Sequence, residues 1–178
     1  MKKSGFTLTE ILVVVAIIGI LSSIALASFG IVREKAKIAK AKSELRSARS
    51  GIALLESDTG KWPNGCPPSQ SSNPEVNLED AQAGVTSRPV EGVVDSPCEW
   101  TADEVNRWNG PYMKVPTDPW GTSYVFDPDY HPGENRPIPP NTNCPGYISS
   151  NIIAVVSYGP NKLGLNAYDC DDVYLEMR

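Results

Sequence analysis

The sequence predicts an α+β protein in which one long N-terminal helix packs on a small antiparallel sheet. Nearly unbroken apolar sequence from Ile11 to Ala27 leads into a stripe of apolar residues with helical spacing. Three short runs with strand composition follow near the C-terminus, separated by segments rich in turn-forming residues. At 178 residues, the chain has room for one modest head after the helix.

The apolar part of the predicted helix is long enough to cross a bilayer. With residues 28–32 included it reaches roughly 22 residues, and a membrane-spanning helix needs about 20. Beyond it, apolar residues recur at steps of three and four until Gly60, a natural helix stop. This stripe consists of Ile38, Ala41, Leu45, Ala48, Ile52 and Leu55. We therefore expect one helix from about Phe6 to about Thr59, apolar all round in its first half and amphipathic in its second.

The head is expected to begin with a connecting region and to end with the sheet. Residues 62–108 are rich in Pro, Gly, Ser and Asn, which predicts a long connection with a short helix at its end, over residues 102–108. The expected strands cover residues 123–126, 152–158 and 173–176.

Charge divides the chain into a basic stem and an acidic head. Between Arg33 and Arg49, seven basic residues stand against two acidic ones, whereas residues 50–178 carry a net charge of about −11. Without interleaved aromatic residues or a recognisable nucleic-acid-binding motif, the basic stem predicts no specific nucleic-acid partner.

The cysteines all lie in the head, at positions 66, 98, 144 and 170. Their spacing does not match a zinc site, even with the single histidine, which favours disulfides over metal ligation. Disulfides imply an oxidising compartment, whereas buried free thiols would suit a cytosolic protein. Of the three possible pairings we favour sequence neighbours, Cys66 with Cys98 and Cys144 with Cys170.

Glu10 distinguishes between the explanations for the N-terminal segment. A secretory signal peptide has a shorter apolar centre than this chain. An ordinary membrane anchor tolerates the length, but a carboxylate in an apolar helix costs about 2.5–3.5 kcal/mol near the bilayer centre and less near its edge. Glu10 should therefore have a partner.

The segment Lys2-Lys3-Ser4-Gly5-Phe6-Thr7-Leu8-Thr9-Glu10, followed by the apolar run, resembles the leader of type IV pilins and pseudopilins. The resemblance implies a type IV pilin-like fold, cleavage by a prepilin peptidase between Gly5 and Phe6, and N-methylation of Phe6. The chain would then comprise a leader (1–5), a transmembrane and filament-core helix (6–32), an amphipathic helix (33–59) and a disulfide-stapled globular head (60–178).

Glu10 is predicted to act in filament assembly. Cleavage creates an α-amino group on Phe6, and Glu10 lies four residues further on, about one helical turn away. In a helical stack of subunits, the amine of one chain can meet the Glu10 carboxylate of its neighbour. The buried charge is then compensated only upon assembly.

A second set of motifs narrows the family. Residues 60–63, 108–113, 116–124, 157–161 and 171–173 resemble the head of the major pseudopilin of type II secretion, above all in Gly110-Pro111-Tyr112 and Asp118-Pro119-Trp120-Gly121. In the last of these, Trp120 is expected to be a core residue within a tight turn.

That family carries a calcium ion, which needs six to eight oxygen ligands. Carried over by position, the resemblance implies calcium ligands at Ser157, Asn161, Asp169, Asp171 and Asp172. Two positions depart from the family pattern: Asn161 stands where an aspartate is expected, and Cys170 lies among the ligands. A Cys144–Cys170 disulfide could therefore stabilise this loop in place of the ion.

The resemblance implies a structural subunit rather than an enzyme, and hydrolase, phosphate-binding and zinc-protease motifs are absent from the sequence. We expect a pseudopilin that polymerises with itself in a type II secretion-like system for protein export. Its implied partners are minor pseudopilins or pilins, the prepilin peptidase, and an inner-membrane platform with its ATPase. A type IV pilin of a surface pilus (adhesion, twitching motility or DNA uptake) and a monomeric membrane-anchored binding module are the alternatives.

The expected location is the bacterial inner membrane, with a single pass through the lipid and the head outside the cytoplasm. After assembly, the subunit would form part of a periplasmic or extracellular filament. One observation opposes this topology: Lys and Arg are more numerous after the apolar run than before it, which favours a cytoplasmic head. The leader and the four distal cysteines favour the opposite side.

Overall fold

The computed structural model describes residues 5, 7–68, 74–95, 97–114, 117–136 and 142–177, without the side chains of residues 24–28 and 95. It divides into two compact units, Met1–Lys37 and Ile38–Arg178. The second unit therefore contains the amphipathic half of the helix together with the head. The predicted division into leader, transmembrane helix, amphipathic helix and head is based on processing and membrane insertion. The two compact units do not test it.

The long helix α1 (Leu8–Thr59) is continuous, as the sequence predicts, although its expected start at Phe6 lies outside the described residues. It ends at Thr59 and is followed by Gly60, whose φ of 80° suits a residue without a side chain and whose N–H donates to the Glu56 carbonyl oxygen at 2.8 Å. Within the described part of the chain, no helix has a stretch both long and apolar enough to cross a membrane.

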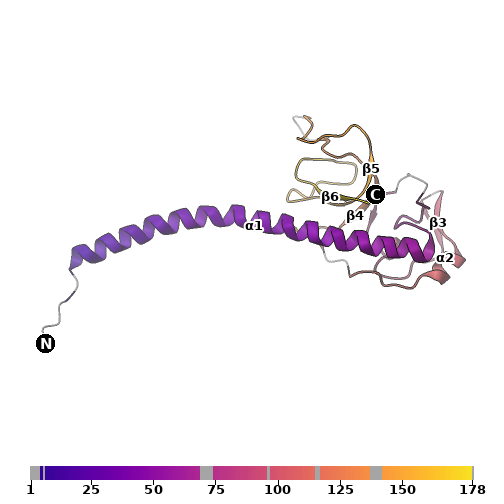
Figure 1. The fold of residues 1–178 in the computed structure, drawn as a ribbon, viewed down its shortest axis with the longest axis horizontal. Helices are drawn as coiled ribbons and strands as arrows, with labels where there is room; N and C mark the ends of the chain where they lie inside the picture. Colours follow the sequence, from indigo (N-terminus) through magenta and orange to yellow (C-terminus); the bar gives the residue numbers. More distant parts are fainter. Residues whose placement is uncertain are drawn as a thin grey trace. The chain divides into compact units, whose positions relative to one another are not determined.

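The described part of the head contains two antiparallel sheets (Figure 1). The larger has the order β1-β4-β5-β6, formed by Val76–Asn77, Val125–Tyr130, Ile152–Ser157 and Val173–Glu176. The smaller is a hairpin of β2 (Gly92–Asp95) and β3 (Cys98–Trp100). Two short helices, the 3-10 helix η1 (Ala81–Ala83) and α2 (Ala102–Arg107), complete the head.

The predicted fold class is confirmed, and the sequence also locates most of its elements. β5, β6 and α2 have nearly the expected bounds, whereas β4 begins two residues later than expected and continues to Tyr130. The expected connection at residues 62–108 contains β1, η1 and the hairpin, which were not predicted. These elements span two to four residues each, too few to show a period in sequence.

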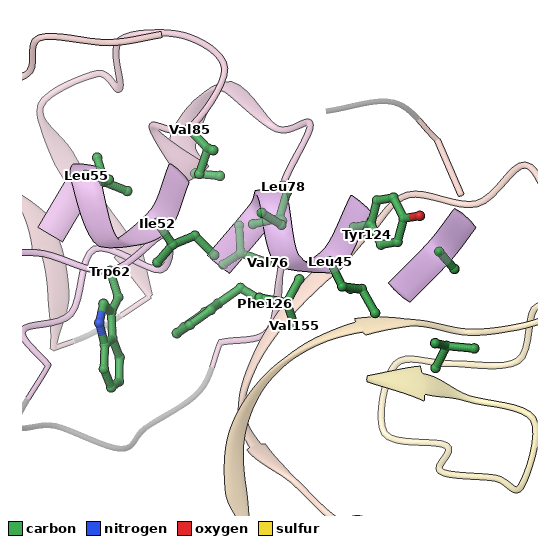
Figure 2. Packing of buried hydrophobic residues seen from close by; sticks show 14 of the residues in the cluster. Leu45, Ile52, Leu55, Trp62, Val76, Leu78, Val85, Tyr124, Phe126 and Val155 are labelled. Atoms are coloured by element: carbon green, nitrogen blue, oxygen red, sulfur yellow. The ribbon is translucent and has the colours of Figure 1, made fainter. Parts of the chain in front are cut away.

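The predicted stripe of α1 faces the larger sheet and forms the main core. Ala41, Leu45, Ala48, Ile52 and Leu55 have no exposed surface, and Ile38 is partly buried against them. They share one cluster with Phe126 and Val155, register partners on β4 and β5, and with Trp62 (Figure 2). Trp120 is 9% exposed in the same cluster, as expected of a core residue.

The opposite face of the larger sheet is also buried. Neighbouring strand residues point to opposite faces, so Ala154 and Val156 lie behind Val155. They cluster with Tyr130, and Tyr158 and Tyr168 pack against them. The loop between β5 and β6 therefore covers the face of the sheet that α1 does not.

Both disulfides join the predicted pairs. Cys66–Cys98 connects the segment after α1 to β3, and Cys144–Cys170 connects the loop after β4 to the loop before β6. The first lies in the interior, because both of its cysteines have 0% exposure. The second lies nearer to the surface, since Cys170 is exposed.

Candidate functional site

At the start of α1, Thr7 and Glu10 form a capping box. The Thr7 backbone N–H donates to Glu10 Oε2 at 2.7 Å, and the Glu10 N–H donates to Thr7 Oγ1 at 3.3 Å. The Thr7 hydroxyl donates to the same carboxylate oxygen at 2.7 Å. The box satisfies backbone donors that a helix start leaves unpaired. The Glu10 carboxylate thus has partners within its own chain, which the sequence analysis missed although the Thr-x-x-Glu spacing signals them.

The two predicted processing residues both precede this helix start in the sequence. Gly5 is exposed and lies before α1, whereas Phe6 lies outside the described residues. Cleavage between them and methylation of Phe6 stay predictions. Just beyond, Leu8, Ile11, Leu12 and Val15 line an open apolar groove on the helix surface.

In the head, Ser157 does not face the other predicted calcium ligands. Its hydroxyl donates to Asp118 Oδ2 at 2.6 Å. The same carboxylate accepts the N–H of Trp120 at 3.0 Å, the N–H of Thr122 at 2.8 Å and the Thr122 hydroxyl at 2.7 Å. Asp118 therefore fastens the Asp-Pro-Trp-Gly turn to the end of β5, a structural role that the sequence analysis did not assign to it.

Three predicted ligands do gather in the loop between β5 and β6. The Asn161 side-chain amide donates to Asp169 Oδ2 and to Asp171 Oδ1, both at 2.7 Å. Burial, followed by hydrogen bonding to Asp169, raises the pKa of Asp171. The amide and the two carboxylates thus form one compact polar group.

The fifth predicted ligand, Asp172, turns toward the sheet. Its Oδ2 accepts the Tyr130 hydroxyl at 3.0 Å and the Asp169 N–H at 3.2 Å, whereas its Oδ1 is buried with no hydrogen-bond partner among the described residues. Burial, and then the negative charge of Asp169, raises the pKa of Asp172 to about 8. The Asp172 side chain is thus hydrogen-bonded to β4 of the sheet through Tyr130.

This arrangement does not match a calcium site. Calcium requires six to eight oxygens around one point, but an amide N–H group lies between the two gathered carboxylates. Within the described residues, no group of three or more His, Cys, Asp or Glu side chains is arranged to hold a metal ion. Calcium binding stays a prediction. The Cys144–Cys170 disulfide, the alternative way to stabilise this loop, is present.

Another buried carboxyl group, which was not predicted, lies at the covered face of the sheet. Asp127, on β4, is 4% exposed and accepts the Asp129 N–H at 3.0 Å. Burial, followed by the charge of Glu75, raises the pKa of Asp127, and burial likewise raises the pKa of Glu75. The strand contains Asp-Pro-Asp, which reads as a turn in sequence, so the burial of Asp127 had no sequence signal.

The chain has two family matches, one at the N-terminus and one within the head. Residues 1–26 match the family described as Prokaryotic N-terminal methylation motif, and residues 86–138 match Type II secretion system (T2SS), protein G. No solved structure matches the chain significantly.

The relatives include both type II secretion proteins and a type IV pilin. Type II secretion system core protein G of Pectobacterium carotovorum subsp. carotovorum is 29% identical over 131 residues, covering 73% of this chain and 70% of the relative. The protein of the same name from Escherichia coli (strain K12) is 28% identical over 134 residues, covering 75% and 76%. Type IV major pilin protein PilE1 of Neisseria gonorrhoeae is 28% identical over 92 residues, covering 48% and 56%.

A long N-terminal helix on a small antiparallel sheet, with a methylation motif over residues 1–26, is a type IV pilin-like fold. Within that class, the protein G domain and the core protein G relatives support a major pseudopilin of type II secretion. These relatives are named as core proteins of type II secretion systems, which favours a non-enzymatic role. The methylation motif and the protein G domain also indicate a membrane-anchored or filament location.

Proposed function

We propose that this chain polymerises through α1 into the filament of a type II secretion-like system for protein export. The observation that carries the proposal is the surface of the first unit. Its large apolar side chains from Leu8 to Leu21 are between 49% and 80% exposed and lie on all sides of the helix. Such a surface needs lipid or other apolar helices around it, and a bundle of identical helices supplies the latter.

Glu10 is the residue to which the proposal gives a specific role. In the filament, its carboxylate pairs with the amine that cleavage creates on Phe6 of a neighbouring subunit. In the single chain the carboxylate is held by Thr7. Assembly therefore exchanges an internal cap for an intermolecular ion pair, and the charge of Glu10 becomes necessary only in the second state.

The test separates the charge of Glu10 from its capping role. Glu10→Gln removes the charge but keeps a side-chain oxygen that can accept the Thr7 N–H, as in other capping boxes. We expect both Glu10→Gln and Glu10→Ala to be cleaved normally and to form at most about a tenth of the wild-type filament, because each leaves the buried Phe6 amine unpaired, at a cost of about 3–5 kcal/mol. Filaments are quantified by shearing and electron microscopy, and cleavage by mass spectrometry of the mature N-terminus.

Glu34→Ala is the matched control, because it removes a carboxylate from the same helix outside the apolar segment. Glu34 forms an ion pair with Lys37 at 3.6 Å. We expect this variant to assemble normally. Wild-type filament yield from Glu10→Gln would refute the ion pair and leave only the cap as the role of Glu10.

The proposal includes the processing and location that this function needs. A prepilin peptidase cuts between Gly5 and Phe6, and Phe6 is N-methylated. Before assembly, the subunit spans the bacterial inner membrane once, surrounded by lipid, with its disulfide-bonded head outside the cytoplasm. A membrane platform with its ATPase and the minor pseudopilins assemble it. The two disulfides support the oxidising side for the head.

A surface pilus is the second candidate, because the chain also matches a type IV major pilin over 48% of its length. Immunogold labelling of intact cells separates the two: filaments confined to the envelope support the pseudopilus, and long extracellular fibres support the pilus. A mature protein that retains residues 1–5, or that is cut elsewhere, would instead support a monomeric membrane-anchored binding module.

A further inference from the structure

The side chain of Asn161 links two parts of the loop between β5 and β6. One amide group donates both of its N–H bonds, the first to Asp169 Oδ2 and the second to Asp171 Oδ1, each at 2.7 Å. Two carboxylates that share a site repel each other unless donors or a cation lie between them. Here a neutral amide occupies that position.

The orientation of the amide is fixed by a third hydrogen bond. The Leu163 N–H donates to Asn161 Oδ1 at 2.8 Å. A backbone N–H cannot donate to an amide NH₂ group, so exchanging the amide oxygen and nitrogen would lose this bond. It would also turn the oxygen toward two carboxylates. The NH₂ group therefore faces the aspartates.

Backbone groups complete the same arrangement. Asp171 Oδ2 accepts the Asn161 N–H at 3.0 Å, and Asp169 Oδ1 accepts the Asp171 N–H at 3.0 Å. Each carboxylate thus receives one backbone N–H and one amide N–H. Cys170, between the two aspartates, is bonded to Cys144 in the neighbouring loop. A divalent cation is therefore not needed to join these segments.

We propose that the Asn161 amide takes the place of a divalent cation between Asp169 and Asp171, so that the head is held together independently of calcium. The proposal concerns the stability of the head and does not depend on the filament function. It also implies that Asn161→Asp creates a cation site. The substitution removes both bridging N–H bonds and leaves three carboxylates, the hard oxygen ligands that calcium prefers.

The experiment compares the wild type with Asn161→Asp as full-length chains in detergent micelles. Melting is followed by tryptophan fluorescence in a chelator and in millimolar calcium chloride. We expect the wild-type Tm to change by less than about 1 °C and that of Asn161→Asp to rise by at least about 5 °C with calcium. In the chelator, Asn161→Asp should melt below the wild type because its three carboxylates repel one another. Isothermal titration calorimetry should detect calcium binding to Asn161→Asp alone.

Two further variants serve as controls. Asn166→Asp adds the same charge to an exposed position of the same loop and should show no calcium response. Asn161→Ala removes the amide without adding a ligand; it should melt lower than the wild type in both buffers.

Two results would overturn the proposal. A wild-type Tm that rises with calcium as much as that of Asn161→Asp means that the native loop binds the ion. An Asn161→Asp variant that folds but does not respond to calcium means that the amide does not occupy a cation position. If Asn161→Asp does not fold in the chelator, the wild-type titration and Asn161→Ala still decide whether the native loop needs calcium.

Discussion

The carboxyl groups of the head fall into two environments. Asp118 is buried and accepts four hydrogen bonds, from Trp120, Thr122 and Ser157. Asp127 is buried and Asp172 is half-buried; both lie near other carboxylates and accept fewer hydrogen bonds. In the second environment the protonated form is favoured, which links the stability of the head to pH.

The head is predicted to be more stable in mild acid than in base. The pKa of Asp172 is raised to about 8 from a model-peptide value of 3.8, and that of Asp127 is raised as well. Between these values the folded state holds protons that the unfolded chain has released, so stability falls as pH rises from about 4 through about 8. Urea unfolding of the full-length chain in detergent, at several pH values in this window, should show a midpoint that decreases steadily.

Asp172→Asn tests whether this residue causes the slope. The asparagine keeps an oxygen that can accept the Tyr130 hydroxyl but cannot ionise, so the decrease in midpoint should become smaller. Glu79→Gln, at an exposed turn, should leave the slope unchanged. Equal slopes for the wild type and Asp172→Asn would exclude Asp172 as the titrating group.

At the scale of the element, α1 is one helix whose two halves have different surroundings. Its first half exposes apolar side chains on every side, whereas its second half buries one stripe and exposes charged residues. In the second half, packing rather than composition decides which side chain stabilises the head. Two adjacent leucines show this, because Leu55 is 0% exposed and Leu54 is 56% exposed.

Leu55→Ala is predicted to destabilise the head by about 2–5 kcal/mol, because it leaves a cavity between α1 and the core. Leu54→Ala, at the neighbouring position, should change the free energy of unfolding by no more than about 0.5 kcal/mol. Urea unfolding of both variants in detergent provides the comparison. Similar losses for the two would mean that the stripe does not carry the packing of α1 on the head.

The elements that the sequence predicts are those in which local pattern and tertiary packing agree. The stripe of α1 and strands β5 and β6 carry the periodicity of the faces they bury, and the Gly5 to Glu10 segment is recognisable from residue identity alone. β1 was missed because its two residues become a strand only by pairing with Val125 and Phe126. The geometry around Asn161 was missed because the spacing of oxygen-bearing residues does not reveal which atom of an amide faces its neighbours.

On the scale of the whole molecule, the two disulfides belong to different parts of the head. Cys66–Cys98 is fully buried, and its Cys98 lies on the same strand, β3, as the buried Trp100. Cys144–Cys170 holds the outer loops over the other face of the sheet, and Cys170 is accessible to solvent. Thiol–disulfide exchange requires a thiolate to reach one of the two sulfurs, so access decides the order in which the disulfides open.

Under native conditions, limiting dithiothreitol is therefore predicted to reduce Cys144–Cys170 first. Cys66–Cys98 should open only when the core itself opens, so its reduction rate should increase with urea as global unfolding does. Differential alkylation followed by peptide mass spectrometry measures both rates in one sample. Leu55→Ala should accelerate reduction of Cys66–Cys98 roughly in proportion to its loss of stability, with little effect on Cys144–Cys170. Equal acceleration of both disulfides would instead show that the outer loops and the main core open together as one cooperative unit.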